Sequence, residues 1–180
     1  GRFSDTGPIR IGSAFVDRGR CLPWAMDTPC IVCQENCPVS PKAIFTRKEY
    51  QAVRGFSELK TAKTKNKEVR LEERLLNPER FSTGDYFLII AGAPLSSARR
   101  ILHNTDSKFE ILSPFPETAT AGSNSRVSIM IMLQRPFVDP AKCIGCGVCE
   151  HECPVKGRRA IRVTAENESR NRGHALLLKQ

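Results

Sequence analysis

The sequence predicts an α+β fold in which two related cysteine-rich halves form one pseudo-two-fold module, interrupted by a small antiparallel β-domain. Three observations support this prediction: an internal repeat, eight cysteines in two tight groups, and a cysteine-free stretch between them with alternating apolar residues. The predicted segments are residues 1–48 (first half), 49–136 (inserted linker and β-domain), 137–165 (second half) and 166–180 (polar tail).

The composition is that of an ordinary globular chain with a basic charge balance. Of 180 residues, 40% are hydrophobic, and the formal net charge is +9. No run of about 18 apolar residues indicates a transmembrane segment. This positive charge suggests nucleic acid or an acidic membrane surface as a partner. The simpler interpretation is a solvated basic surface without a partner. Because the chain begins at Gly1, we expect a processed product or a fragment.

The internal repeat extends beyond the cysteines. Residues 15–21 and 137–143 share Phe-Val-Asp, two spacers, a cation and a cysteine, and residues 37–44 match 153–161 with one residue inserted. The repeated pattern therefore predicts, for each half, a short strand, a cysteine-bearing loop and a second strand. Neither half is long enough to close a core alone.

The segment between the halves carries the signals of a small β-domain. Residues 60–67 are polar and basic, and they predict a linker or an exposed hairpin arm. Strands are expected at residues 69–76, 86–91, 99–103, 109–112 and 127–134. This segment contains no recognisable site, and it is interpreted as a spacer or docking module.

The second cysteine group has the spacing of an iron–sulfur site. Cys143-x2-Cys146-x2-Cys149-x3-Cys153, followed by Pro154, is the pattern of bacterial [4Fe-4S] ferredoxins, in which the fourth cysteine binds the other cluster. Such a loop must turn tightly around the cluster, and glycine allows this turn. Proline after the last cysteine redirects the chain. The residues expected in these roles are Gly145, Gly147, Pro38 and Pro154.

Crossed ligation assigns all eight thiols to two [4Fe-4S] clusters. Cluster one takes Cys21, Cys30, Cys33 and Cys153, and cluster two takes Cys143, Cys146, Cys149 and Cys37. Zinc is the competing metal, but its sites usually pair two separated Cys-x2-Cys knuckles. A radical-generating cluster needs Cys-x3-Cys-x2-Cys, which neither group supplies.

Further residues are candidates for tuning the clusters. Arg20 and Lys142 precede the first ligand of each group, where a cation would raise the potential or meet an acidic partner, unless it is merely solvated. Trp24 is expected either to shield cluster one or to be a core residue. Two clusters of charge about −2 each would lower the effective net charge to roughly +5.

The chain resembles the dicluster ferredoxin family over both repeat units. More narrowly, residues 20–25 and 29–33, with Cys37-Pro38 and residues 153–157, are similar to the C-terminal half of membrane-associated polyferredoxins of the periplasmic nitrate reductase and methylamine utilisation types. The resemblance implies a periplasmic or membrane-associated electron relay between a quinone-linked membrane subunit and a terminal redox partner. A cytoplasmic location is the alternative that the residues leave open.

The leading functional interpretation is a one-electron carrier without its own substrate site, and therefore not an enzyme. It would act as a subunit or fragment of a larger oxidoreductase complex. A nucleic-acid-binding protein with structural iron–sulfur or zinc sites is the alternative, supported by the lysines of residues 60–67. A third interpretation is that the inserted segment recruits a partner and the clusters only staple the fold.

Overall fold

The computed structural model describes residues 9–74, 77–116 and 125–170, and its ordered elements are mostly strands. The described residues form nine strands, three α-helices of four residues each, and one three-residue 3-10 helix. The predicted α+β ferredoxin module is therefore wrong as a fold class, because strand, and not a mixture of helix and strand, dominates the chain.

The helices are short because the cysteine loops stop them. Helix α2 (Leu22–Ala25) follows directly on Cys21, and α3 (Val32–Glu35) and α4 (Val148–His151) each end two residues before a Cys-Pro pair. Proline disfavours the helical conformation in the residue before it, so the helix cannot continue past the cysteine.

The chain divides into two compact units, which we describe separately. Unit 1 contains residues 1–49 and 133–180, and unit 2 contains residues 50–132. The four-segment division drawn from the sequence stays a prediction, because compactness within one chain does not establish domains that fold alone. Part of the predicted polar tail, residues 171–180, lies outside the described residues.

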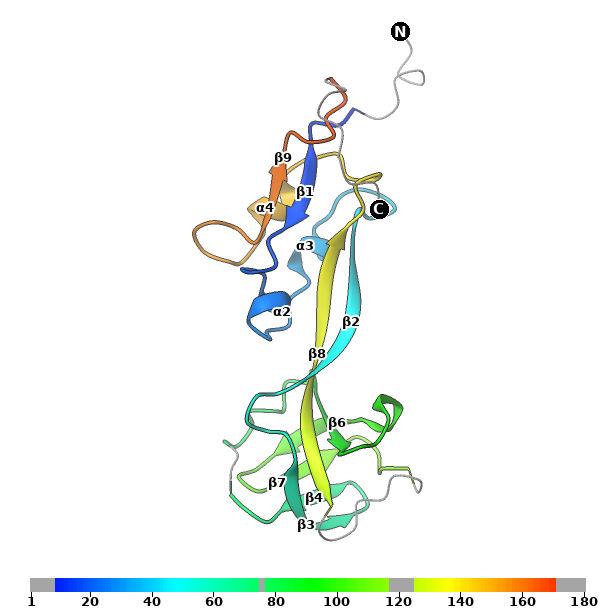
Figure 1. The fold of residues 1–180 in the computed structure, drawn as a ribbon, viewed down its shortest axis with the longest axis vertical. Helices are drawn as coiled ribbons and strands as arrows, with labels where there is room; N and C mark the ends of the chain where they lie inside the picture. Colours follow the sequence, from blue (N-terminus) through cyan, green and yellow to red (C-terminus); the bar gives the residue numbers. More distant parts are fainter. Residues whose placement is uncertain (1–8, 75–76, 117–124, 171–180) are drawn as a thin grey trace. The chain divides into compact units, whose positions relative to one another are not determined.

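Unit 1 joins an early and a late segment of the chain. Strands β1 (Ser13–Val16) and β9 (Ile161–Thr164) pair antiparallel, with Ser13 opposite Thr164 and Val16 opposite Ile161. Figure 1 shows the two strands side by side, one blue and one orange. Strand β8 (Arg126–Val138) leads into the second cysteine group, and β2 (Ile44–Ala52) follows the first. These two strands are also hydrogen-bonded neighbours. Each half thus pairs with the other half.

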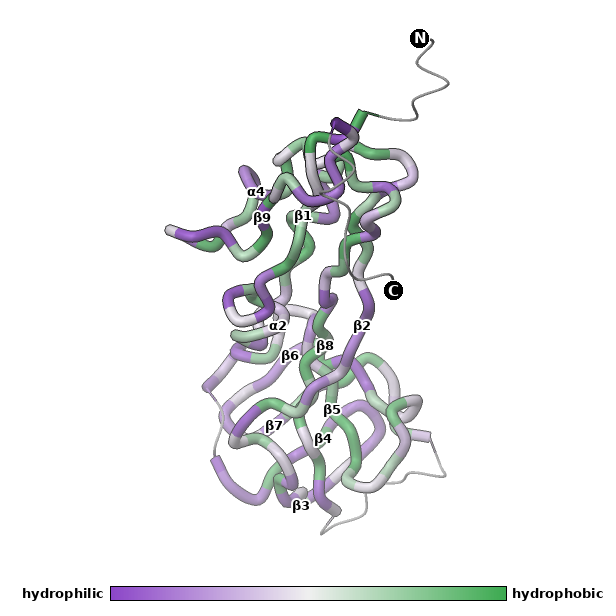
Figure 2. The backbone as a smooth tube through the Cα atoms, turned by 45° about the horizontal axis from the view of Figure 1, so that its top comes forward, coloured by the Kyte–Doolittle hydropathy of each residue, from purple (hydrophilic) through white to green (hydrophobic). Residues whose placement is uncertain are grey.

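Unit 2 is a sheet that closes on itself. Its order is β8-β3-β4-β7-β6-β5, and β5 pairs again with β8, which leaves β2 outside the ring. Figure 2 shows β8 as largely apolar and β2 as largely polar. The remaining strands are β3 (Leu59–Lys65), β4 (Glu68–Leu71), β5 (Tyr86–Ile90), β6 (Arg99–Asn104) and β7 (Lys108–Ile111), with the 3-10 helix at Leu95–Ser97.

Most strand predictions for this segment are confirmed. The expected strands at 86–91, 99–103, 109–112 and 127–134 correspond to β5, β6, β7 and β8. The basic residues 60–67 lie in β3 and the turn to β4, so they form a hairpin arm and not a linker. The strand expected at 69–76 ends at Leu71, and residues 75–76 lie outside the described residues.

The interior of unit 2 is an apolar core in which aromatic rings meet edge to face. Phe81 is fully buried, with ring centroids 5.2 Å from Phe56 and 5.1 Å from Tyr86. Its backbone N–H donates a 2.8 Å hydrogen bond to Oδ1 of the buried Asn104. The core residues are Leu59, Val69, Leu71, Phe81, Leu88, Ile101, Phe109, Ile111, Val127 and Ile129.

Two adjacent residues of β6 test this arrangement. Ile101 is 0% exposed and Leu102 is 43% exposed, so they point to opposite faces of the sheet. We expect Ile101→Ala to lower the free energy of unfolding by about 2–5 kcal/mol, because it removes buried methyl groups and leaves a cavity. Leu102→Ala should cost less than about 1 kcal/mol. Chemical denaturation of both variants checks this, and equal losses would contradict the assigned faces.

Candidate metal centre

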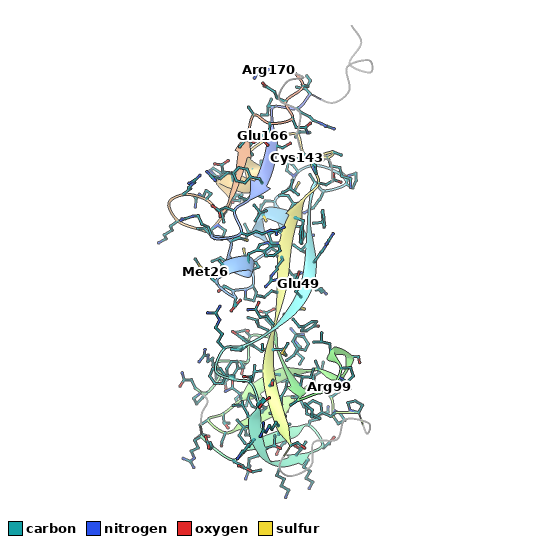
Figure 3. The ribbon with its side chains drawn as sticks, viewed as in Figure 1. Met26, Glu49, Arg99, Cys143, Glu166 and Arg170 are labelled. Carbon is teal, nitrogen blue, oxygen red and sulfur yellow. The ribbon has the colours of Figure 1, made fainter. Side chains whose placement is uncertain are left out.

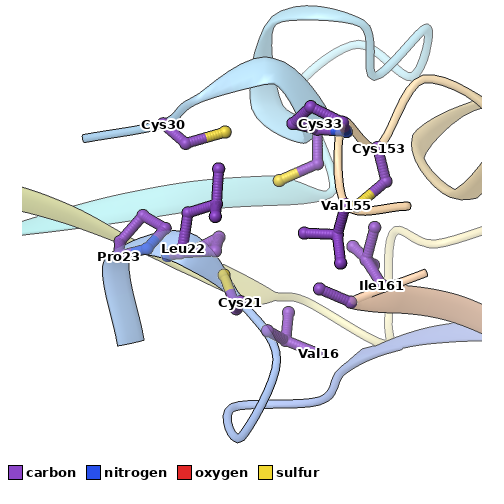
Figure 4. Close-up of a pocket in the computed structure, with 12 residues that line it drawn as sticks. Val16, Cys21, Leu22, Pro23, Cys30, Cys33, Cys153, Val155 and Ile161 are labelled. Atoms are coloured by element: carbon purple, nitrogen blue, oxygen red, sulfur yellow. The ribbon is translucent and has the colours of Figure 1, made fainter. Parts of the chain in front are cut away.

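Four predicted ligands from both halves of the chain line one pocket of unit 1. Cys21, Cys30 and Cys33 come from the first half and Cys153 from the second. Figure 4 shows their side chains around a common space, with the apolar side chains of Leu22, Pro23, Val155 and Ile161 between them. We call this the first site.

The other four predicted ligands line a second pocket of unit 1. Here three cysteines come from the second half, Cys143, Cys146 and Cys149, and Cys37 comes from the first. Apolar residues again fill the wall, including Val39 and Ile144. We call this the second site. The structure therefore brings the predicted ligands together in two crossed sets, with Val39 lining the second site and Val155 the first.

The same turn precedes the first ligand of each set. The N–H of Asp17 donates to the Ala160 carbonyl at 2.7 Å, and the N–H of Asp139 donates to the Ala43 carbonyl at 2.7 Å. One turn later, Cys21 N–H and Cys143 N–H each donate to the aspartate carbonyl four residues back at 3.0 Å. These bonds explain why Phe-Val-Asp is repeated: its aspartate anchors the loop to the opposite half.

Glycines allow the second loop to turn. Gly145 and Gly147 have φ angles of +72° and +81°, in the left-handed region that disfavours side chains. A Cβ on Gly145 would also lie 2.6 Å from the backbone nitrogen of Gly12. Glycine is thus required at position 145 for two reasons: the left-handed backbone conformation, and the close approach of the Gly12 backbone just before β1. The predicted role of these glycines in a tight loop agrees with this geometry.

In each half, the cysteine of the Cys-Pro pair joins the three cysteines of the other half. Cys37 and Cys153 are buried, and the N–H of each donates to the carbonyl three residues back at 3.3 Å. Pro38 lines the second site and Pro154 lines the first, each beside its own cysteine. The proline has no N–H, so it ends the preceding turn and leaves the cysteine at its end.

Three of the thiols, those of Cys21, Cys33 and Cys149, have raised pKa values that keep them protonated at neutral pH in the absence of a bound cation. Burial raises the pKa of Cys33 and of Cys149 to about 12, with further increases from neighbouring cysteines of the same set. Burial raises the pKa of Cys21 to about 11, although a hydrogen bond from the backbone N–H of Trp24 lowers it in part. Because metal ligation needs thiolates, binding must release protons and supply the positive charge that stabilises them.

All eight cysteines are free thiols, with no disulfide among them. Among the residues that the structure describes, no three His, Cys, Asp or Glu side chains meet the geometry of a site for a single metal ion. The donor sets surround hollow spaces lined by apolar groups. Soft thiolate donors with buried apolar surroundings fit an iron–sulfur cube.

Backbone and side-chain donors support the sites. The Ala14 N–H donates to the Sγ atom of Cys143 at 3.3 Å, so a strand of the first half contacts a ligand of the second. Arg159 donates to the carbonyls of Cys153 at 2.7 Å and Val155 at 2.9 Å. Sequence reasoning missed Arg159, because nothing in its local pattern distinguishes it from the neighbouring surface cations.

The two candidate tuning cations have hydrogen-bond partners, Arg20 in the opposite half and Lys142 in its own loop. The Arg20 guanidinium donates to the carbonyls of Arg158 at 2.8 Å and Lys156 at 3.3 Å. The Lys142 ammonium lies 3.0 Å from Asp139 and, chiefly through this hydrogen bond, lowers the pKa of that carboxyl. Both cations therefore stabilise the ligand loops, and their effect on a cluster potential stays a prediction.

Trp24 is half-buried beside the first site, whereas its neighbours Leu22 and Pro23 line that site directly. The indole N–H donates to the Pro136 carbonyl at 3.3 Å. Pro136 also lines the first site and was not anticipated from the sequence. The loop between Cys21 and Cys30 therefore covers the first site through α2, which has no counterpart between Cys143 and Cys146.

Two of the three histidines have carboxylate partners outside the thiol sets. His103 lies 2.7 Å from Glu79, and the 85% exposed His151 lies 2.9 Å from Glu152. His174 lies outside the described residues.

A family model described as a 4Fe-4S binding domain matches residues 134–155, which include the second cysteine group. No curated protein and no solved structure matches the chain. The match supports at least one [4Fe-4S] cluster, and the thiol donor sets described above fit that group. The match is confined to residues 134–155, and it supports an iron–sulfur, ferredoxin-like site at the second cysteine group.

Two glycines with the same φ angle test how tightly the second loop is constrained. Gly145 and Gly157 both have φ +72°, but a Cβ would meet the Gly12 backbone at the first position and nothing within 4 Å at the second. We expect Gly145→Ala to reduce bound iron by half or more, because the loop must move. Gly157→Ala should cost only about 1–2 kcal/mol of stability from the left-handed conformation. Iron analysis and thermal unfolding compare them, and equal iron contents would refute the close approach.

Proposed function

We propose that the protein is a one-electron relay that holds two [4Fe-4S] clusters by crossed ligation. The observation that carries this proposal is the convergence of the eight thiols in two pockets, each with three cysteines of one half and one of the other. This arrangement is the one that the Cys-x2-Cys-x2-Cys-x3-Cys-Pro pattern requires in two-cluster ferredoxins. The matched 4Fe-4S binding domain supports the cluster type.

The donor chemistry of each site suits the cluster. In the proposal, Cys21, Cys30, Cys33 and Cys153 hold one cluster, and Cys143, Cys146, Cys149 and Cys37 hold the other. A bound [4Fe-4S] cluster supplies a centre that accepts and donates a single electron. The raised pKa values of Cys33 in the first site and Cys149 in the second mean that these two thiolates need a bound cation to balance their charge.

The protein's own residues then control the environment of each cluster. Val16, Val155 and Ile161 line the first site, and Val39, Ile144 and Val163 line the second, where they exclude water. N–H groups such as that of Ala14 donate to the ligand sulfurs and offset their negative charge. Apolar walls and hydrogen bonds to sulfur are the means by which a protein sets a cluster potential.

The proposal gives the chain no substrate chemistry of its own, so it is a carrier and not an enzyme. It would pass electrons between redox proteins as part of a larger oxidoreductase complex. The resemblance to membrane-associated polyferredoxins supports a quinone-linked membrane subunit as one partner. Within the described parts of the chain, no helix is long and apolar enough to cross a membrane.

Nucleic-acid binding is less well supported than electron transfer. The basic hairpin of β3 and β4 exposes Lys60, Lys63, Lys65 and Lys67, which gave the charge argument for it. Lys108 on the neighbouring strand β7 is paired with Glu68 at a salt bridge of 2.5 Å, so acidic groups also occur on this surface. The lysines of the hairpin suit phosphate contacts and carry no specificity for a nucleotide base, so we propose no second function.

Pairs of cysteine substitutions test the crossed assignment in anaerobically purified protein. The wild type should contain about eight irons and two reducible centres by EPR-monitored redox titration. Cys153→Ala should leave about four irons, because one cluster loses a ligand. Adding Cys30→Ala should remove no further iron, since both residues serve the first site, whereas adding Cys146→Ala should remove the remaining cluster.

Local ligation predicts the reverse pattern. Cys153→Ala with Cys146→Ala would then keep about four irons, and Cys153→Ala with Cys30→Ala would lose both clusters. Two zinc ions in place of iron, with no reducible centre in the wild type, would contradict the relay itself.

A further inference from the structure

A group of stacked arginines and aromatic rings lies beside the first site in unit 1. We call Arg18, Trp24, Phe45, Arg47 and Phe137 the arginine–aromatic patch. The Trp24 and Phe137 rings meet edge to face with centroids 5.5 Å apart, and Phe45 stacks on Phe137 at 5.6 Å. The Arg18 guanidinium lies 4.3 Å from the Trp24 ring centroid, and that of Arg47 lies 4.6 Å from Phe137.

The patch presents positive charge that no carboxylate neutralises within the described residues. Arg18 and Arg47 are exposed, and neither forms an ion pair there. Arg135 provides the contrast: it also stacks on Trp24, at 4.8 Å, but it pairs with Glu49. Phe45 is 38% exposed, so apolar surface accompanies the two unpaired cations. Arginine and aromatic residues are the types most enriched at protein–protein interfaces and in their hot spots.

The patch is connected to the first site through short contacts. Trp24 lies in α2, and its N–H donates to the carbonyl of the ligand Cys21 at 3.0 Å. Its indole N–H donates at 3.3 Å to the carbonyl of Pro136, which lines the site. Figure 3 labels Met26 at the end of this helix and Glu49 on β2, which border this part of unit 1. A partner on the patch would therefore come close to the first site.

The extra residues of the first half create this surface. Eight residues separate Cys21 from Cys30, whereas two separate Cys143 from Cys146, and the longer loop contains α2 with Trp24. The ring that corresponds to Phe137 in the repeat is Phe15, which lies under Arg162 at 4.8 Å but stacks on no other aromatic ring among the described residues. The two sites thus differ in their surroundings although their ligand sets are alike.

We propose that the arginine–aromatic patch is the docking surface of an acidic redox protein, which exchanges electrons with the chain through the first site. This inference rests on the proposed relay function. Opposite charges speed the encounter of such partners and fix their orientation. A nucleic acid fits less well, because bases need free ring faces for stacking, and guanidiniums already lie over Trp24 and Phe137.

Two electron-transfer proteins of opposite charge serve as probes: the acidic blue-copper protein plastocyanin and the basic protein cytochrome c. The first readout is the Kd of redox-inert, cadmium-substituted plastocyanin for the cluster-loaded protein, measured by calorimetry at low salt. The second is the rate at which the reduced protein reduces each copper- or haem-containing probe. We expect Arg18→Glu with Arg47→Glu to weaken plastocyanin binding and slow its reduction by about tenfold, and to flatten the salt dependence of the rate. Reduction of cytochrome c should not slow.

The control changes the charge by the same amount elsewhere. Lys63→Glu with Lys67→Glu alters two exposed lysines of the β3–β4 hairpin and should change plastocyanin binding less than twofold. Equal effects of the two double variants would show a dependence on net charge alone and would overturn the proposal. No effect of either would also overturn it, as expected if another part of the chain or a second copy covers the patch.

The neutral variant Arg18→Gln with Arg47→Gln guards against a folding defect, and it should give a smaller loss of the same sign. Iron content and reductive titration of each variant separate this inference from the proposed function. If both clusters load and reduce normally while plastocyanin binding is unchanged, the relay stands and the docking surface does not.

Discussion

The structure of unit 1 depends on the pairing of one half of the chain with the other. Strand β1 pairs with β9, and Asp17 and Asp139 each donate a backbone hydrogen bond across the halves. Because of this exchange, a cysteine of one half reaches the three cysteines of the other. The thiols of Cys33 and Cys149 are unfavourable as thiolates, so a bound cation is expected to contribute to folding as well as to function.

The two units divide structure and function unequally. Unit 2 has an apolar core of its own in a sheet that closes on itself, whereas the core of unit 1 consists largely of the cysteines and the small apolar residues around them. A core of this composition buries little apolar area per residue, and metal ligation is a common means of stabilising such small modules. The asymmetry between the sites arises from one loop, in which α2 brings Trp24 beside the first site.

Motif spacing predicted the sites better than periodicity predicted the fold. The cysteine pattern and the repeat identified which thiols would meet, because ligand geometry restricts sequence spacing closely. The apolar run at residues 86–91 and the alternation at residues 127–134 predicted strands β5 and β8, because a buried sheet face requires apolar side chains at regular positions. The α+β class was wrong because each helix has only four residues, and two of the three end just before a Cys-Pro pair, so strand dominates the described residues. The roles of Arg159 and Pro136 depend on contacts between distant residues and left no local signal.

Anomalous diffraction at the iron edge, from crystals of anaerobically purified protein, tests the central claim most directly. The account predicts two separate iron clusters, one bounded by the sulfurs of Cys21, Cys30, Cys33 and Cys153 and the other by those of Cys37, Cys143, Cys146 and Cys149. A single iron cluster, zinc ions between the thiols, or a cluster held by four cysteines of the same half would contradict it.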